Sequence, residues 1–253
     1  MNANTPASPV KDESSNTVLI LGAYSDVAKE AIKLYAARGY TIIAASRSVD
    51  KLQDFIRQHG FPENQVMIRY FDATAFDDHK KFYFDLPLKP NIVVYAAGFL
   101  KDNETAMHDW QSTYQMMKVH YCGAVSILNI VATDPDNSSL KRIIGLSSLS
   151  GVRGRKSNFI YGSTKSAFTQ YLAGLRQYLS PRGIVVNVLV AGYIRTKMTE
   201  GLGLNQSLML EPGFIARAVV QAGNRFITVP GYKWKMIYRI LTLLPEQLVA
   251  RLP

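Results

Sequence analysis

The sequence predicts a single α/β domain, a Rossmann-like, doubly wound parallel sheet of about seven strands with helices on both faces. Short runs rich in Val, Ile and Leu alternate with longer segments of helical periodicity, as in strands joined by crossover helices. No internal repeat or linker interrupts this alternation, and 253 residues lie near the upper size of one domain. We therefore expect one domain, over residues 17–230.

The elements follow in chain order. Residues 17–21 are a short apolar strand that runs into a glycine turn, and the helix expected at 27–38 ends at Gly39, a common residue after a helix. Similar apolar runs predict strands at 41–45, 66–70, 92–96, 143–147, 185–191 and 226–229. Helical spacing predicts helices at about 109–132, 158–179 and 214–221.

Two segments flank the domain. Residues 1–16 are rich in Asn, Ser, Pro and charge, without the apolar core of a signal peptide, and predict a disordered tail. Residues 231–253 carry apolar residues at helical spacing among lysines, arginines and aromatics, and predict an amphipathic segment. Such a segment can lie on a membrane surface, cover the domain's own pocket or contact a partner subunit, and the sequence leaves these three open.

Composition narrows the functional classes. The single cysteine, Cys122, rules out a disulfide within the chain and fits a cytoplasmic location. The four histidines show no metal-ligand spacing, so no metal is expected. The net charge of +10 suits a phosphorylated ligand, the inner face of an anionic membrane, or simply a basic soluble surface. No nucleic-acid recognition motif accompanies the charge, so nucleic acid is not an expected partner.

The most informative residues are Tyr161 and Lys165, which are four positions apart, and Ser148, which precedes them. On a helix, residues i and i+4 share a face, so the phenol and the ammonium project into the same space. A nearby cation favours the phenolate. A serine at the end of a preceding strand can hydrogen-bond the oxygen that gains or loses the proton. This group predicts carbonyl and alcohol chemistry.

With the glycine turn after the first strand, residues from about Thr17 to Thr199 resemble the short-chain dehydrogenase/reductase family. The family turn is Gly-x-x-x-Gly-x-Gly. Gly22 keeps the first glycine, and Asp26 and Ala28 stand at the other two positions. The carboxylate of Asp26 would repel a pyrophosphate unless it turns away to cap the helix.

The resemblance implies that hydride passes from a nicotinamide to a carbonyl carbon. Tyr161 is expected to protonate the oxygen, Ser148 to orient it, and Lys165 to bind the nicotinamide ribose. His120 stands where the family has an asparagine that helps to hold a proton-relay water. It is expected either to take over that catalytic role or to pack between helices.

The cofactor is expected to be NADP(H), because an arginine and no acid follows the second strand, and an arginine there accommodates a 2′-phosphate. The resemblance places the cofactor at Gly22, Tyr24, Ser25, Asp26, Val27, Ser46, Arg47, Ser48, Asp72, Ala96, Ala97, Gly98, Tyr161, Lys165, Gly192, Ile194 and Thr196.

The substrate is expected to be a carbonyl compound. Arg153, Arg155 and Lys156 are expected either at the pocket rim, where they could meet a substrate phosphate, or in a solvated loop. The turn and the C-terminal segment are similar to the subgroup that contains decaprenylphosphoryl-2-keto-ribose reductase, which favours a keto-sugar linked to a lipid phosphate. The alternatives are fatty acyl, steroid-like or xenobiotic ketones, and an idle NADP(H)-binding sensor or scaffold. The family also implies a homodimer or homotetramer built on the two long helices.

Overall fold

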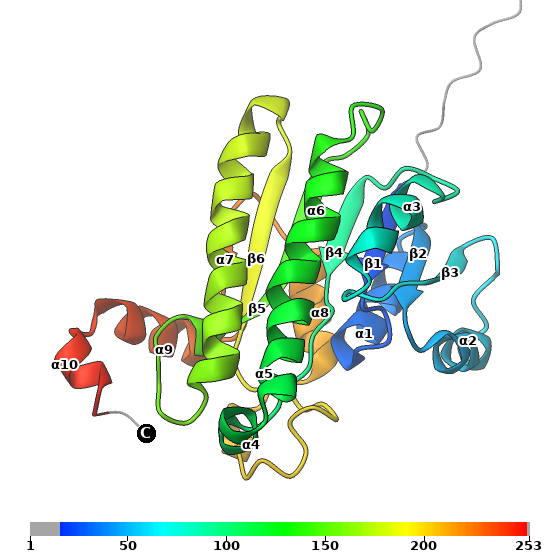
Figure 1. Ribbon diagram of the computed structural model, residues 1–253. Coiled ribbons are helices and arrows are strands. Elements are labelled where there is room, and N and C mark those ends of the chain that lie inside the picture. The colour runs from blue at the N-terminus through cyan, green and yellow to red at the C-terminus, as the bar shows by residue number, and fades with distance from the viewer. Residues whose placement is uncertain (1–15, 252–253) are drawn as a thin grey trace, which may run out of the picture.

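The computed structural model describes residues 16–251, so the predicted disordered tail lies almost wholly outside the described residues. Seven strands form one sheet in which every pairing is parallel, in the order β3-β2-β1-β4-β5-β6-β7 (Figure 1). The predicted fold class is confirmed. The strands are β1 (Thr17–Leu21), β2 (Thr41–Ser46), β3 (Val66–Tyr70), β4 (Ile92–Tyr95), β5 (Arg142–Ser148), β6 (Val185–Ala191) and β7 (Ile227–Thr228).

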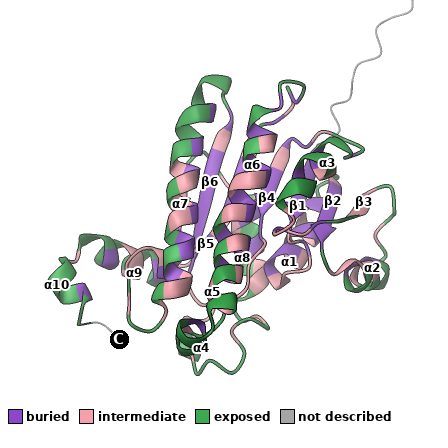
Figure 2. Cartoon of the chain, viewed as in Figure 1, coloured by how far each residue is buried: buried purple, intermediate pink, exposed green. Residues whose placement is uncertain are grey.

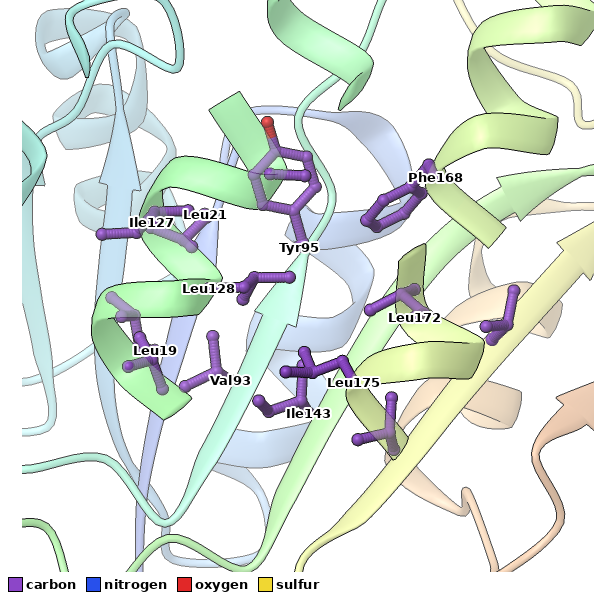
Figure 3. Packing of buried hydrophobic residues seen from close by; sticks show 14 of the residues in the cluster. Leu19, Leu21, Val93, Tyr95, Ile127, Leu128, Ile143, Phe168, Leu172 and Leu175 are labelled. Atoms are coloured by element: carbon purple, nitrogen blue, oxygen red, sulfur yellow. The ribbon is translucent and has the colours of Figure 1, made fainter. Parts of the chain in front are cut away.

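Helices cover both faces of the sheet because the strands are apolar on both sides. In β1, Val18 and Ile20 pack with one set of helices, and Leu19 and Leu21 pack with the other. Figure 3 shows the second set, in which side chains from α6 and α7 meet those of β1, β4 and β5. The first set is α1 (Asp26–Ala36), α2 (Val49–Gln58) and α8 (Pro212–Val220), and the second is α3 (His79–Phe84), α6 (Gly123–Thr133) and α7 (Phe159–Leu179).

The long helix expected at 109–132 is present but is not uniform. It consists of α5 (Trp110–Met117), one π-helical turn (Lys118–Cys122) and α6, which follow one another without a break. A π turn holds an extra residue in the helix, and such turns are frequent at functional sites. This one carries His120. The sequence pattern missed α2, α3 and α4 (Asn103–His108).

The C-terminal segment forms α9 (Tyr232–Leu243) and α10 (Glu246–Val249), beside the lower end of α7 in Figure 1. Trp234 is buried, and its Nε1 donates to the Leu208 carbonyl oxygen at 2.8 Å. The guanidinium of Arg153 donates to the carbonyl oxygens of Leu241 and Thr242 at 3.0 and 3.3 Å. The helix is therefore attached to the domain at both ends.

The other side of α9 is exposed, as its green colour in Figure 2 indicates. An apolar ridge, the α9 ridge, runs along this side at helical spacing and consists of Tyr232, Met236, Ile240 and Leu243. Within the described part of the chain, no helix combines the length and the hydropathy needed to cross a membrane.

Candidate active site

The site lies at the carboxyl ends of the strands, where β1 and β4 are neighbours although they are not consecutive in the chain. Ligands of doubly wound sheets bind at such a switch point, because the chain leaves the two strands in opposite directions and opens a crevice. A cavity of about 400 Å³ occupies this position. Every residue predicted to bind the cofactor lines this cavity except Gly192.

The glycine turn after β1 forms one wall. Gly22 has a φ of +85°, and a Cβ built there would lie 2.5 Å from the Ala97 nitrogen, so the position requires glycine. Ser25 caps α1, with its Oγ accepting the Ala28 N–H at 3.2 Å. Asp26 therefore does not turn away to cap the helix, because Ser25 caps it. The Asp26 carboxylate instead pairs with Lys29 and accepts the Lys197 amide.

The end of the cavity beyond β2 is basic. Arg47 lines it and is exposed, and among residues 16–251 the structure gives its guanidinium no ion pair or hydrogen bond. Ser46 Oγ accepts the Ser48 N–H at 3.1 Å, which shapes the turn that carries the arginine. Asp72 lines the same region, but its Oδ1 is taken up by the Thr74 N–H at 2.8 Å and the Thr74 hydroxyl at 2.9 Å. A free cation remains there to meet an anionic group.

Tyr161 and Lys165 line the cavity farther along, and Ser148, which does not line it, hydrogen-bonds Tyr161. Ser148 ends β5, and its Oγ accepts the Ser150 N–H at 3.2 Å, which leaves its hydroxyl proton for the Tyr161 phenol. Burial raises the pKa of Tyr161 to about 12, although the Ser148 hydrogen bond acts to lower it. The sequence led us to expect a phenolate favoured by the lysine, but here desolvation dominates. The phenol is therefore protonated at neutral pH and can act as a proton donor.

Lys165 is a buried cation that borders the cavity. Its side chain is buried, and burial lowers its pKa to about 8. Among the described residues its Nζ has one hydrogen-bond acceptor, the Leu146 carbonyl oxygen at 3.1 Å. An ammonium has three N–H groups, so two remain for a bound ligand. The hydroxyls of a ribose suit this arrangement, and the residues of the cavity thus fit a dinucleotide.

His120 is placed by the π turn between the site and α7, and it is fully buried. Its Nε2 accepts the Phe99 N–H at 3.1 Å, and its Nδ1 lies 2.8 Å from the Thr164 hydroxyl. That hydroxyl donates to the Tyr161 carbonyl oxygen at 2.8 Å, so His120 Nδ1 is the donor to Thr164 and the ring is neutral. Burial, together with the nearby charge of Lys165, holds the pKa of His120 well below its usual value. Both ring nitrogens are occupied by protein, which favours the packing role over the water relay.

The remaining predicted residues lie elsewhere. Gly192 packs under α9, since a Cβ built there would lie 2.1 Å from the Trp234 ring. Arg153 borders a separate cavity of about 850 Å³ between α5 and the start of α7, while Arg155 and Lys156 line neither cavity. The sequence argument missed several lining residues, although most adjoin predicted ones: Phe71, Ala73, Phe99, Val119, Leu146, Ser147, Lys197 and Met198.

The chain is similar to several known proteins. A sequence model described as short chain dehydrogenase matches residues 16–207. An uncharacterized oxidoreductase of Mycobacterium tuberculosis is 28% identical over 251 residues, covering 96% of this chain and 99% of that protein. An uncharacterized oxidoreductase of Staphylococcus epidermidis is 28% identical over 204 residues, covering 81% of this chain and 89% of that one.

The fold has close counterparts among solved structures. A short chain dehydrogenase from Burkholderia cenocepacia, crystallised in complex with NADP, superposes with a TM-score of 0.81 at 19% identity, over 94% of this chain and 97% of that one. The family match covers most of the domain, including the cavity and the Ser148, Tyr161 and Lys165 group. The chain belongs to the short-chain dehydrogenase family of oxidoreductases.

Proposed function

We propose that the protein is an NADPH-dependent carbonyl reductase. The observation that carries this proposal is one cavity that a free arginine, Tyr161 and Lys165 all line. A 2′-phosphate would pair with Arg47, and Lys165 would hold the ribose next to the nicotinamide. The NADP in the related Burkholderia structure supports the same choice of cofactor.

The chain's own residues would hold the substrate in place and donate a proton to it. Bound in the cavity, a reduced nicotinamide supplies the hydride. Ser148 and Tyr161 would both hydrogen-bond the substrate carbonyl oxygen, and the phenol, protonated at neutral pH, would give up its proton as the alcohol forms. The ammonium of Lys165 would stabilise the phenolate that remains.

Cofactor choice is tested by fluorescence titration with NADPH and NADH. Arg47→Ala is expected to weaken NADPH binding roughly tenfold or more, since a charge-assisted pair is lost, and Arg47→Asp is expected to remove the preference. Lys51→Ala is the control, because Lys51 is exposed on α2 and does not line the cavity. Equal affinity of the wild type for both cofactors would contradict the assignment.

The role of Tyr161 is tested by Tyr161→Phe, which removes the hydroxyl and keeps the ring. Turnover is expected to fall about 10²- to 10⁴-fold, as for the loss of a general acid, with a much smaller loss of NADPH affinity, because phenylalanine keeps the ring that lines the cavity. Tyr171→Phe is the matched control on the same helix, where the hydroxyl donates to Asn129 Oδ1 at 2.8 Å, away from the cavity. An active Tyr161→Phe enzyme would sink the mechanism and favour the idle-sensor alternative.

For the substrate we infer a keto-sugar linked to a lipid phosphate, presented at an anionic membrane. The keto-sugar follows from the subgroup that the sequence resembles, and the support for the membrane is the α9 ridge, whose helix also carries Lys233, Lys235 and Arg239 and no acidic residue. Apolar side chains flanked by cations suit the boundary between acyl chains and anionic headgroups. Because Arg153 is bound to α9, the expected contact between a substrate phosphate and Arg153 is no longer part of this proposal.

Membrane contact is tested by sedimentation with vesicles of phosphatidylglycerol and of phosphatidylcholine. The wild type is expected to bind the anionic vesicles, and Ile240→Glu, on the α9 ridge, to lose that binding. Leu88→Glu is the control, since it adds the same charge at an exposed apolar residue outside α9. Protein that ignores anionic vesicles, and reduces acyl or steroid-like ketones but no lipid-linked keto-sugar, would overturn the substrate proposal.

A further inference from the structure

Asp26 departs from the family pattern at the point where a cofactor pyrophosphate approaches α1. It lines the cofactor cavity as the first residue of that helix. Its Oδ1 lies 2.9 Å from Lys29 Nζ, and its Oδ2 accepts the backbone N–H of Lys197 at 3.1 Å. Partial burial acts to raise the pKa of Asp26, but the bonds from Lys29 and Lys197 outweigh it and the net pKa is lowered. The carboxylate is therefore ionised at neutral pH.

The segment at residues 194–199 also lines the cavity, through Ile194, Thr196, Lys197 and Met198. Its start is anchored, because the Arg195 N–H donates to the Leu210 carbonyl oxygen at 2.9 Å. Beyond it the chain is irregular up to the short turn at Gln206–Leu208. Among the residues that the structure describes, the Asp26–Lys197 bond is the only hydrogen bond between the glycine turn at 22–28 and this segment.

We propose that Asp26 is a positioning residue that straps the 194–199 segment across the cofactor cavity and so slows the release of the dinucleotide. The strap joins the glycine turn to this segment at the pyrophosphate end, so bound cofactor leaves only when the bond to Lys197 opens. Lys29 pairs with the same carboxylate and offsets its repulsion of the pyrophosphate. The inference rests on the proposed cofactor.

A carboxylate that merely repels the cofactor predicts the opposite effect of substitution. Loss of a repelling charge tightens binding and slows release. Loss of a strap speeds release, because the segment no longer closes the cavity. Asp26→Asn separates charge from hydrogen bonding, since its amide oxygen can still accept the Lys197 N–H while the charge is gone.

The first experiment measures NADPH release by stopped-flow fluorescence. Asp26→Ala is expected to release NADPH roughly tenfold faster than the wild type, the size of one lost hydrogen bond to a charged group, and Asp26→Asn to remain within a few-fold. Glu30→Ala is the matched control, because Glu30 lies on α1, pairs with Lys33 and does not line the cavity. Release from Asp26→Ala at the wild-type rate or slower overturns the strap.

The second experiment needs no cofactor. Without NADPH, trypsin is expected to cut after Lys197 several-fold faster in Asp26→Ala than in the wild type, Asp26→Asn or Glu30→Ala, with the site identified by mass spectrometry. Equal cutting in all four proteins overturns the strap even if NADPH binds. Failure of the wild type to bind NADPH would instead contradict the proposed function, and proteolysis would still decide the role of Asp26.

Discussion

Lys165 places a positive charge inside the protein, and that charge has a cost to stability. An unfolded lysine has a pKa of 10.5, and burial lowers the pKa of Lys165 to about 8. Between pH 8 and 10.5, Lys165 is protonated in the unfolded chain but largely deprotonated in the folded protein. This residue therefore makes the free energy of unfolding rise with pH over that interval. At neutral pH Lys165 is charged in the folded protein, so the full cost of burying its ammonium lowers the free energy of unfolding. The residue that binds the ribose in our proposal therefore destabilises the fold.

The expected result is that Lys165→Met unfolds at a higher temperature than the wild type at pH 7 without cofactor. The gain should be about 2 kcal/mol, once the lost hydrogen bond to Leu146 is deducted from the pKa difference. It should shrink as the pH approaches 10.5. Lys80→Met, at an exposed position on α3, is the control and should change little. A less stable Lys165→Met protein would show that the ammonium's contacts outweigh its desolvation.

His120 makes the protein sensitive to acid. Its folded pKa is held well below 6.5, mainly by burial, so as the pH falls below about 6.5 the unfolded chain takes up the proton first. Stability is then lost at up to about 1.4 kcal/mol per pH unit for this one group. Protonation of Nε2 would also break the bond from the Phe99 N–H.

The predicted consequence is that His120→Asn flattens the decline of stability between pH 6.5 and 5, measured by urea unfolding at each pH. His79 is also buried with a lowered pKa, so His79→Asn measures its separate share of the slope. A catalytic water relay predicts, in addition, that His120→Asn changes the pH profile of turnover, whereas a packing role alone leaves that profile unchanged. An unaltered stability slope in His120→Asn would contradict the packing role.

At the scale of elements, the N-terminal half of α9 is attached to the domain by the indole of Trp234. The Trp234 ring lies over Gly192 and packs edge-on against Tyr193, with ring centroids 4.9 Å apart. Gly192→Ala would put a methyl group into the ring, and Trp234→Ala would remove the ring. Each change should lower the free energy needed to detach α9 from the domain by roughly 2 kcal/mol or more.

The two changes share one contact, so they should not be additive. The double variant is expected to cost less than the sum of the single variants, because a methyl group at position 192 meets no ring once Trp234 is gone. Hydrogen exchange of residues 232–243 measures the loosening directly. Additive effects would mean that Gly192 is required for another reason, such as the cofactor contact expected from the family pattern.

The elements that the sequence predicted are those with an apolar run or a long helical repeat. The strands 17–21 and 185–191 have the predicted limits, because nearly continuous burial requires an apolar residue at nearly every position. The short helices α2 and α4 were missed because each buries only one or two residues. The residues that line the cofactor cavity could be predicted because they stand at the positions of the family motif. The attachment of Arg153 to α9 could not, because it joins residues 88 positions apart through backbone oxygens, which have no signature in the sequence.

At the scale of the whole molecule, α5 and the π turn expose an apolar stripe of Trp110, Tyr114, Met117 and Tyr121, with Phe159 also exposed at the start of α7. A stripe of this composition is typical of a subunit interface. It lies on the long helices where the family resemblance placed the oligomer contact. We therefore expect a homodimer or homotetramer that uses this face.

Met117→Glu with Trp110→Glu is expected to shift the protein toward monomers, because the interface would have to bury two unpaired charges. Sedimentation velocity measures the shift. Met236→Glu with Ile240→Glu, on the α9 ridge, is the matched control for surface charge, and it should leave the assembly intact. If the α9 pair dissociates the oligomer and the α5 pair does not, the interface lies at the C-terminal helices.

The π turn at Lys118–Cys122 connects this outer stripe to the inner wall of the site. It sets the angle at which Trp110, Tyr114 and Met117 face outward while Ile127 and Leu128 face the sheet. Deleting one of its five residues would straighten the helix and rotate one half relative to the other by about 100°. Either the stripe or the core contacts would then be lost. Evolution can exchange side chains in this turn, but the length of the segment is constrained, and we expect insertions and deletions to be excluded from it.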